Sequence, residues 1–364
     1  MPEIQISNLT KRYGSIVANN QINLTIHNGE YVSVIGPSGC GKTTLIKNIA
    51  GIISPDEGDI IVDGQRINDL PIEQRRIGYV FQNIALFPHL SVWGNIIYGP
   101  RVRGIAIEEI RPLALEMLEL IKLRERVDAY PSELSGGSQQ KTAVARALTS
   151  RAELLLLDEP LGALDVKVRA ALRAELRKLV KDLGLTAFHV THDQEEAMSI
   201  SDRVIVMKKG RIVEAGAPIN LYTKPQHIFT ANFVGEANFL VGVIERYTEV
   251  GAVITIGDTM EIQSSDMSHH IGDQVVLAFR PEFIEISDQK VNKLQGMIEN
   301  IIFSGNIERL VIRLANKERI TVKTIGEQSE NLTINTQIHL SIDPDAILVY
   351  SYPEEGLEKE LALE

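Results

Sequence analysis

One eight-residue stretch restricts the possible fold of this chain more than any other. Gly36–Thr43, GPSGCGKT, follows the strand-like segment EYVSVIG and opens the helix-forming segment KTTLIKNIAG. A strand, a glycine-rich loop and a helix in this order predict backbone amides that surround the β- and γ-phosphates of a nucleotide. Lys42 would neutralise phosphate charge, and the Thr43 hydroxyl would bind Mg²⁺. The stretch therefore predicts an α/β domain that binds a nucleoside triphosphate.

Composition limits the remaining classes. The chain has 364 residues, enough for two or three domains, with 44% hydrophobic and 23% charged residues. Its net charge of −11 argues against a broad basic face for nucleic acid or anionic lipid. No apolar run approaches the ~18 residues of a membrane-spanning helix, so another chain would supply any span. The single cysteine, Cys40, rules out an intrachain disulfide; it is either a small residue at a variable loop position or a redox sensor.

The hydrophobic pattern divides the chain in two. To about residue 233, strand-like runs such as AELLLLD and TAFHVTH alternate with helical patterns such as VRAALRAELRKLVKDLG, which predicts a buried parallel sheet with helices. Beyond NFVGEANFL, short β-runs separated by turns predict an all-β domain of small-barrel type. We therefore expect an α/β domain over 1–235, a β-domain over 236–353 and an acidic tail over 354–364.

The segment LLLLDEP predicts the catalytic half of the nucleotide site. An apolar strand would deliver Asp158 to the Mg²⁺ shell through water. Glu159, directly after it, is placed to polarise the attacking water and is our candidate for the catalytic base. The alternative is a carboxylate pair that caps a loop before Pro160.

Three further side chains are candidates for nucleotide contact. His192 ends another strand, in THDQEEA, where Asp193 and Glu196 have the spacing of a helix capping box. His192 is either structural or a sensor of the γ-phosphate. Gln82 is either an ordinary loop glutamine or a switchable ligand of Mg²⁺ or the attacking water. Tyr13 either packs or stacks on an adenine.

The stretch ELSGGSQQKTAVARAL predicts a second anion site. A serine and two glycines precede a helix-favouring run, which leaves backbone amides open at a helix N-terminus. Open amides of this kind attract anions. The residues themselves do not identify the anion.

Together these segments resemble the ATP-binding-cassette (ABC) ATPases. The family's aromatic loop corresponds to Tyr13, its Q-loop to Gln82, its D-loop to LGALD and its switch histidine to His192. Walker A corresponds to Gly36–Thr44, the signature to Leu134–Ser138, and Walker B to Leu154–Asp158 with Glu159. The resemblance implies a P-loop ATPase domain with a helical subdomain over about 88–155. The residues expected to bind ATP are Tyr13, Gly36, Pro37, Ser38, Gly39, Cys40, Gly41, Lys42, Thr43, Thr44, Ser135, Gly136, Gly137 and Asp165. Those expected at Mg²⁺ are Thr43, Gln82 and Asp158, and those expected to act in catalysis are Glu159, His192 and Gln82.

The resemblance also implies an assembly. In this family two ATPase domains pack head to tail, so Ser135, Gly136 and Gly137 of one copy would face the γ-phosphate held by the other. The chain departs from the usual signature at Ser138 and Lys141, where glutamine and arginine are commoner, and it has Trp93–Gly94 in the segment that faces the membrane subunits.

The C-terminal segments NFLVGVIE, LAFRPEFIEI and DPDAILVY resemble the transport-associated OB domain of importer ATPases. The join FVGEANFL is most similar to that of polyamine, ferric-iron and oxyanion importers. The implied protein is an importer ATPase on the cytoplasmic face of the membrane, with two permeases, a solute-binding protein and no nucleic acid as partners. The alternative is a non-transport ABC ATPase that acts on nucleic acid or ribosomes. The β-domain itself is either a dimerisation module or a binder of a regulatory solute.

Overall fold

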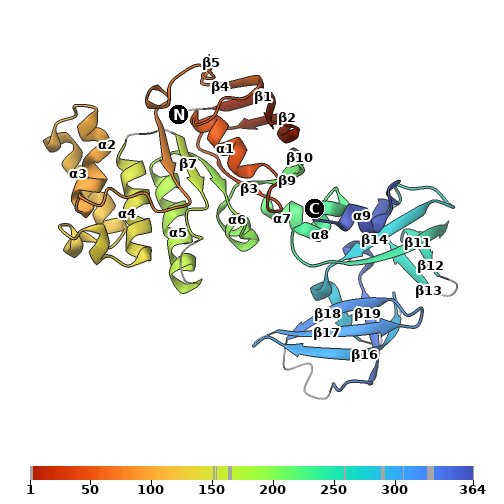
Figure 1. Ribbon diagram of the computed structural model, residues 1–364. Helices are drawn as coiled ribbons and strands as arrows, with labels where there is room; N and C mark the ends of the chain where they lie inside the picture. Colours follow the sequence, from red (N-terminus) through yellow and green to blue (C-terminus); the bar gives the residue numbers. More distant parts are fainter. Residues whose placement is uncertain are drawn as a thin grey trace. The chain divides into compact units, whose positions relative to one another are not determined.

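The computed structural model describes residues 3–150, 152, 154–162, 166–257, 260–287, 292–305, 307–325 and 332–363. These residues form two compact units, which divide between Ile219 and Asn220 (Figure 1).

The centre of the first unit is a sheet of six described strands in the order β10-β9-β3-β8-β7-β6. The neighbours from β9 to β6 are parallel, and β10 is antiparallel to β9. Parallel strands bring their carboxyl ends to one edge, where ligands bind in open α/β sheets. The strands are β3 Tyr31–Ile35, β6 Ile77–Val80, β7 Leu154–Asp158, β8 Thr186–Val190, β9 Arg203–Lys208 and β10 Arg211–Gly216.

Both faces of this sheet are covered, which explains the continuous apolar run in β7. Leu154 and Leu156 pack into one hydrophobic cluster with helix α1 (Lys42–Ala50), whereas Leu155 and Leu157 pack into another with helical residues such as Ile96, Ala145 and Leu176. A strand buried on two faces needs apolar residues at every position. The parallel sheet predicted from AELLLLD and TAFHVTH is confirmed.

The other elements of the first unit flank this sheet. An antiparallel sheet of four described strands has the order β2-β1-β4-β5, and helices α2, α3 and α4 lie together (Figure 1). The strands are β1 Ile4–Tyr13, β2 Ile16–Ile26, β4 Glu57–Val62 and β5 Gln65–Arg66. The helices are α2 Val92–Val102, α3 Ile107–Leu120, α4 Gly136–Thr149, α5 Val166–Asp182 and α6 Gln194–Ile200.

The second unit is built from two antiparallel sheets of five described strands, β13-β12-β11-β14-β20 and β15-β19-β16-β17-β18, around one apolar core. The first sheet contains β11 Asn238–Tyr247, β12 Ala252–Ile256, β13 Met260–Ser264, β14 Gln274–Phe279 and β20 Leu348–Ser351. The second contains β15 Ile284–Ile286, β16 Leu294–Phe303, β17 Ile307–Leu314, β18 Arg319–Ile325 and β19 Gln337–Ile342.

Short helices join this β-structure, which explains why the units divide before residue 235. The buried guanidinium of Arg280 donates to the carbonyls of Tyr222 and Ala231, so it holds the segment after Ile219 to the strands. The acidic tail forms a helix, and Asn232 donates to the carbonyl of Leu361 in it. These helices are α7 Pro218–Thr223, α8 Ile228–Phe233 and α9 Leu357–Leu361.

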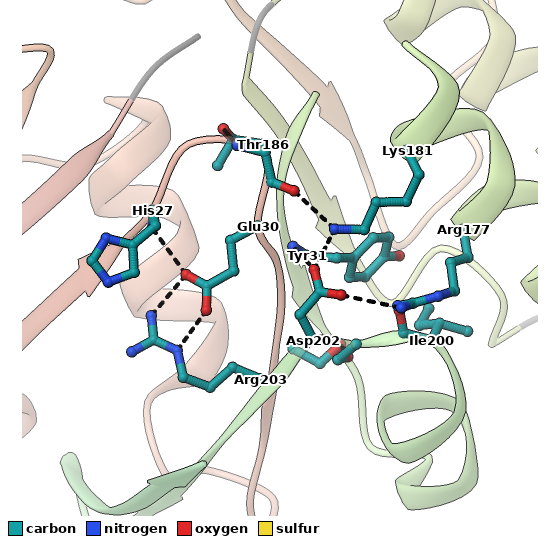
Figure 2. A network of polar contacts seen from close by, with 12 residues as sticks. His27, Glu30, Tyr31, Arg177, Lys181, Thr186, Ile200, Asp202 and Arg203 are labelled. Carbon is teal, nitrogen blue, oxygen red and sulfur yellow. Dashed lines mark hydrogen bonds and ion pairs between the residues drawn. The ribbon is translucent and has the colours of Figure 1, made fainter. Parts of the chain in front are cut away.

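Two carboxylates fasten the amino ends of the central strands (Figure 2). Asp202, just before β9, accepts hydrogen bonds from the backbone N–H of Tyr31 at 2.8 Å and from Arg177 at 3.1 Å, and it also binds Lys181. Glu30, just before β3, pairs with Arg203, whose Nε lies 2.8 Å from Glu30 Oε1. These contacts join β3 and β9 to the carboxyl-terminal half of α5. No helix within the described ranges is long and apolar enough to cross a bilayer.

Candidate functional site

The phosphate loop takes the conformation that its glycines predict. Gly41 caps α1 with φ 102°, and a Cβ there would lie 2.1 Å from the carbonyl oxygen of Ala18. Only glycine fits such a position without moving the neighbouring backbone. Lys42 is buried, and its Nζ donates to the carbonyls of Gly36 at 2.7 Å and Pro37 at 2.9 Å. The loop therefore holds a positive charge at its centre.

The other loop residues differ in exposure. Ser38 and Gly39 are exposed, whereas Thr43 and Thr44 are half-buried at the start of α1. Cys40 is buried, and burial raises the pKa of its thiol despite the nearby Lys42. A raised pKa favours the unreactive thiol over the thiolate, so the small-residue interpretation of Cys40 fits better than the redox one.

Strand β7 ends in a buried carboxylate with spare binding capacity. Tyr79 donates its hydroxyl hydrogen to Asp158 Oδ2 at 3.0 Å, while Oδ1 is buried and has no hydrogen-bond partner among the described residues. Burial raises the pKa of Asp158, although Tyr79 and nearby lysines act in the opposite direction. A buried carboxylate oxygen without a donor is costly unless a ligand, water or a cation completes it. Asp158 therefore fits the Mg²⁺ role that the sequence predicts.

The three predicted catalytic side chains meet at the carboxyl edge of the sheet. Glu159 Oε2 accepts a hydrogen bond from Gln82 Nε2 at 2.7 Å and lies 3.2 Å from His192 Nδ1. Glu159 has φ 48°, a left-handed conformation that a hydrogen bond from its N–H to the carbonyl of Val190 stabilises. Segments far apart in the chain thus place an amide, a carboxylate and an imidazole around one point.

The signature residues lie elsewhere in the first unit. Ser135 caps α4, and its Oγ accepts from the Ser138 N–H at 3.3 Å and lies 3.1 Å from Ser138 Oγ. Ser135 and Gly136 are exposed, and α4 packs against α2, α3 and β6. The predicted open helix N-terminus is present, with the unusual Ser138 in contact with the capping hydroxyl.

Two further residues, Tyr13 and Asp165, are predicted to contact the nucleotide. Tyr13 is half exposed at the end of β1, with Lys11 Nζ 5.7 Å from its ring centroid. Asp165 lies outside the described residues. Stacking of Tyr13 on adenine and contact of Asp165 with nucleotide stay predictions.

Sequence reasoning did not find several supporting residues. Tyr79 holds Asp158, and Asn19 donates to the carbonyl of Gly41 at 3.1 Å. The capping box is only half made: Asp193 accepts from the N–H of Glu196, but the Glu196 carboxylate accepts from Thr191 Oγ1 instead of the Asp193 N–H. A polar residue within an apolar strand, as in GYVFQ, is the sequence pattern that could have indicated Tyr79.

Comparison with known proteins identifies the family. The model of the ABC transporter family matches residues 19–162, and that of the TOBE domain matches residues 277–349. The spermidine/putrescine import ATP-binding protein PotA of Haemophilus influenzae is 42% identical over 293 residues, 80% of this chain and 79% of the relative. The protein of the same name from Pseudomonas fluorescens is 37% identical over 353 residues, 95% of this chain and 98% of the relative.

This chain belongs to the ABC transporter ATPases. Among solved structures, the ABC ATPase resembles a dimeric bacterial ABC transporter cassette with 36% identity and a TM-score of 0.54, covering 59% of this chain and 98% of the cassette. It also resembles CbiO1 from Clostridium perfringens, part of an ABC transporter complex, with 30% identity and a TM-score of 0.57, covering 61% and 90%. The predicted P-loop ATPase domain, OB domain and ATPase activity are confirmed.

Proposed function

We propose that this ABC ATPase is the energy-coupling subunit of a polyamine importer. The observation that carries the proposal is the extent of the similarity to proteins named for spermidine and putrescine import, which covers both units of the chain. The relatives named above carry polyamine names, whereas ferric iron and oxyanions are suggested by the sequence of the join alone. The ATPase would sit at the cytoplasmic face of the membrane, where two permeases and a solute-binding protein complete the importer.

The geometry of the site supports a mechanism for hydrolysis. The loop from Gly36 to Thr44 would hold the triphosphate, with Lys42 against its terminal phosphates. Glu159 would accept a proton from the attacking water. As the oxygen of that water bonds to the γ-phosphorus, the bond between the γ-phosphorus and the leaving ADP oxygen breaks. Gln82 and His192, both next to Glu159, would orient that water and contact the γ-phosphate. Asp158 and Thr43, with Gln82, would hold Mg²⁺, which neutralises phosphate charge when bound.

A second copy of the chain would complete each site. Ser135, Gly136 and Gly137 lie at the N-terminus of α4, where Ser135 and Gly136 are exposed. An anion at such a terminus is stabilised by backbone N–H groups and the helix dipole. We infer that this anion is the γ-phosphate on a partner chain, that Asp165 also approaches it, and that ATP binding closes the dimer and hydrolysis opens it.

The segment after Gln82 offers a route from the site to the permeases. Asn95 in α2 fixes this segment, since its side chain donates to and accepts from the backbone of Phe87. Arg146 in α4 donates to the carbonyl of Ala85 at 2.7 Å. A change at Gln82 would therefore be transmitted to the helical part of the first unit, which we propose as the permease-facing surface.

Uptake measurements test the importer proposal. Cells that lack this chain should lose uptake of radiolabelled spermidine or putrescine, and the wild-type chain should restore it, whereas Glu159→Gln should not. Unchanged polyamine uptake in the deleted cells would reject the polyamine assignment. Parallel assays with ferric iron and sulfate separate a wrong solute from a wrong importer role.

A further inference from the structure

A group of connected polar side chains is buried behind the loop that carries His192. Thr191 Oγ1 donates to Glu196 Oε2 at 2.6 Å, and Glu196 Oε1 lies 3.4 Å from His189 Nε2. The Nδ1 atom of His189 lies 3.2 Å from the hydroxyl of Tyr31. None of these four side chains is more than 2% exposed. Burying so many polar groups is unfavourable unless they pair with one another, so their arrangement is tightly constrained.

Hydrogen bonds of Thr191, a member of this polar group, fix the backbone on both sides of His192. The N–H of Thr191 donates to the carbonyl of Val34 at 3.2 Å, which holds the residue before His192. The N–H of Asp193 donates to Thr191 Oγ1 at 3.0 Å, which holds the residue after it. Because Thr191 Oγ1 accepts from Asp193 while it donates to Glu196, the Glu196 carboxylate sets the direction of the hydroxyl.

A second tie connects the same loop to α5. Asp193 accepts from the N–H of Glu196 at 3.0 Å and from Arg169 Nη1 at 2.9 Å. His192 itself is well exposed, so few contacts of its own ring hold it in place. The position of its Nδ1, 3.2 Å from Glu159 Oε2, therefore depends on the loop beneath it.

Burial favours the uncharged forms of these polar side chains. Burial raises the pKa of Glu196 to about 7 and lowers that of His189 to about 3, so both shifts favour the uncharged form of the side chain. Burial also raises the pKa of Tyr31, which keeps its hydroxyl protonated. The charged groups that act on Glu196 from neighbouring elements are Asp193, Arg169 and Arg173.

We propose that Glu196 is a positioning residue for His192: through Thr191, and supported by His189, it holds the switch loop so that the imidazole faces the Glu159 carboxylate. The inference rests on the proposed role of His192 at the γ-phosphate. An apolar side chain could fill the space behind the loop, but it could not accept the hydrogen bond of Thr191.

Steady-state ATPase kinetics of single variants provide the first test. Glu196→Ala and Thr191→Val remove the same hydrogen bond from its two ends, and each should lower kcat about tenfold while KM for ATP stays within about twofold. Glu195→Ala, one residue away with a largely exposed side chain, is the matched control and should leave both constants within about twofold. If Glu196→Ala does not fold, Thr191→Val, which keeps the shape of the side chain, carries the test. A folded Thr191→Val variant with wild-type kcat would overturn the inference.

Two further variants separate positioning from simple stabilisation. Glu196→Gln keeps an acceptor for Thr191 and should restore kcat to within about threefold of wild type. In a His192→Ala background, Glu196→Ala should lower kcat no further, because its effect passes through His192. A further tenfold loss would show that Glu196 acts independently and would contradict the inference. Normal kcat in His192→Ala alone would instead reject the proposed role of His192.

Discussion

The two ends of the central sheet use charged groups in opposite ways. At the amino end, Asp202 is surrounded by the N–H of Tyr31 and by Arg177 and Lys181, all from the same chain (Figure 2). At the carboxyl end, Asp158 keeps one buried oxygen without a hydrogen-bond partner among the described residues, and the Glu159 carboxylate contacts the uncharged Gln82 and the exposed His192.

This difference separates stability from function within one sheet. Burial alone would raise the pKa of Asp202, but hydrogen bonds from Lys181 and Tyr31 and the charges of Lys181 and Arg177 outweigh it and lower that pKa. For Asp158 burial prevails and the pKa is raised. A carboxylate whose partners lie within the chain stabilises the fold, whereas one that lacks them is suited to bind an external cation.

The largest expected effect is at the carboxyl end. Glu159→Gln should lower kcat for ATP hydrolysis by at least about 100-fold, because the amide cannot accept the proton of the attacking water. ATP binding should persist, so the variant should accumulate an ATP-dependent dimer that size-exclusion chromatography detects. Normal turnover would show that Glu159 is not the base.

The same variant allows a test of the cross-chain signature. Adding Ser135→Arg should abolish the ATP-dependent dimer without weakening ATP binding by the monomer, since a bulky side chain would occupy the helix N-terminus. A dimer that still forms with ATP would contradict the role assigned to Ser135. Glu195→Gln, whose side chain lies outside the Glu159 cluster and the signature helix, is the control for Glu159→Gln.

A smaller effect, on stability rather than chemistry, is expected at the amino end. Asp202→Ala leaves Arg177, Lys181 and the N–H of Tyr31 without their shared acceptor, so it should lower the free energy of unfolding by about 2 kcal/mol. KM for ATP should stay within about twofold. Urea unfolding of the nucleotide-free protein measures the first quantity; unaltered stability would remove the contrast between the two ends.

The smallest effect is a pH dependence of stability that comes from Glu196, in helix α6. The pKa of Glu196 rises from 4.5 to about 7 on folding, so its contribution to stability is complete below about pH 4.5 and is lost as the pH rises to about 7. Glu196→Gln does not titrate. The free energy of unfolding of the wild type, relative to this variant, should therefore fall gradually as the pH rises through that window.

Unfolding in urea at pH 5, 6, 7 and 8 measures this trend. Asp202→Asn is a useful comparison. The wild-type Asp202 carboxylate has a lowered pKa, so its contribution to stability is present above pH 3.8. The free energy of unfolding should therefore differ between wild type and Asp202→Asn by a constant amount across the series. A constant difference for Glu196→Gln as well would contradict the raised pKa of Glu196.

Local patterns account for the parts of the site that could be predicted. A strand, a glycine loop and a helix are specified by adjacent residues, so β3, the phosphate loop and α1 followed from GPSGCGKT and its flanks. In the same way, LLLLDEP predicted a buried strand that ends at Asp158. Packing decided what these patterns leave open. The Glu196 carboxylate turned inward rather than completing a capping box, since the Thr191 hydroxyl, directly after β8, is a buried hydrogen-bond donor.

By itself, the sequence determined the nucleotide motifs, their order and the change from an α/β pattern to a β pattern, because each depends on residues close together in the chain. Only the tertiary structure decided which side chains meet. Gln82 and Glu159 are 77 positions apart, yet they share a hydrogen bond because β6 and β7 are parallel neighbours that end at one edge. Tyr79 reaches Asp158 for the same reason. Such contacts are set by strand order, which no local pattern specifies.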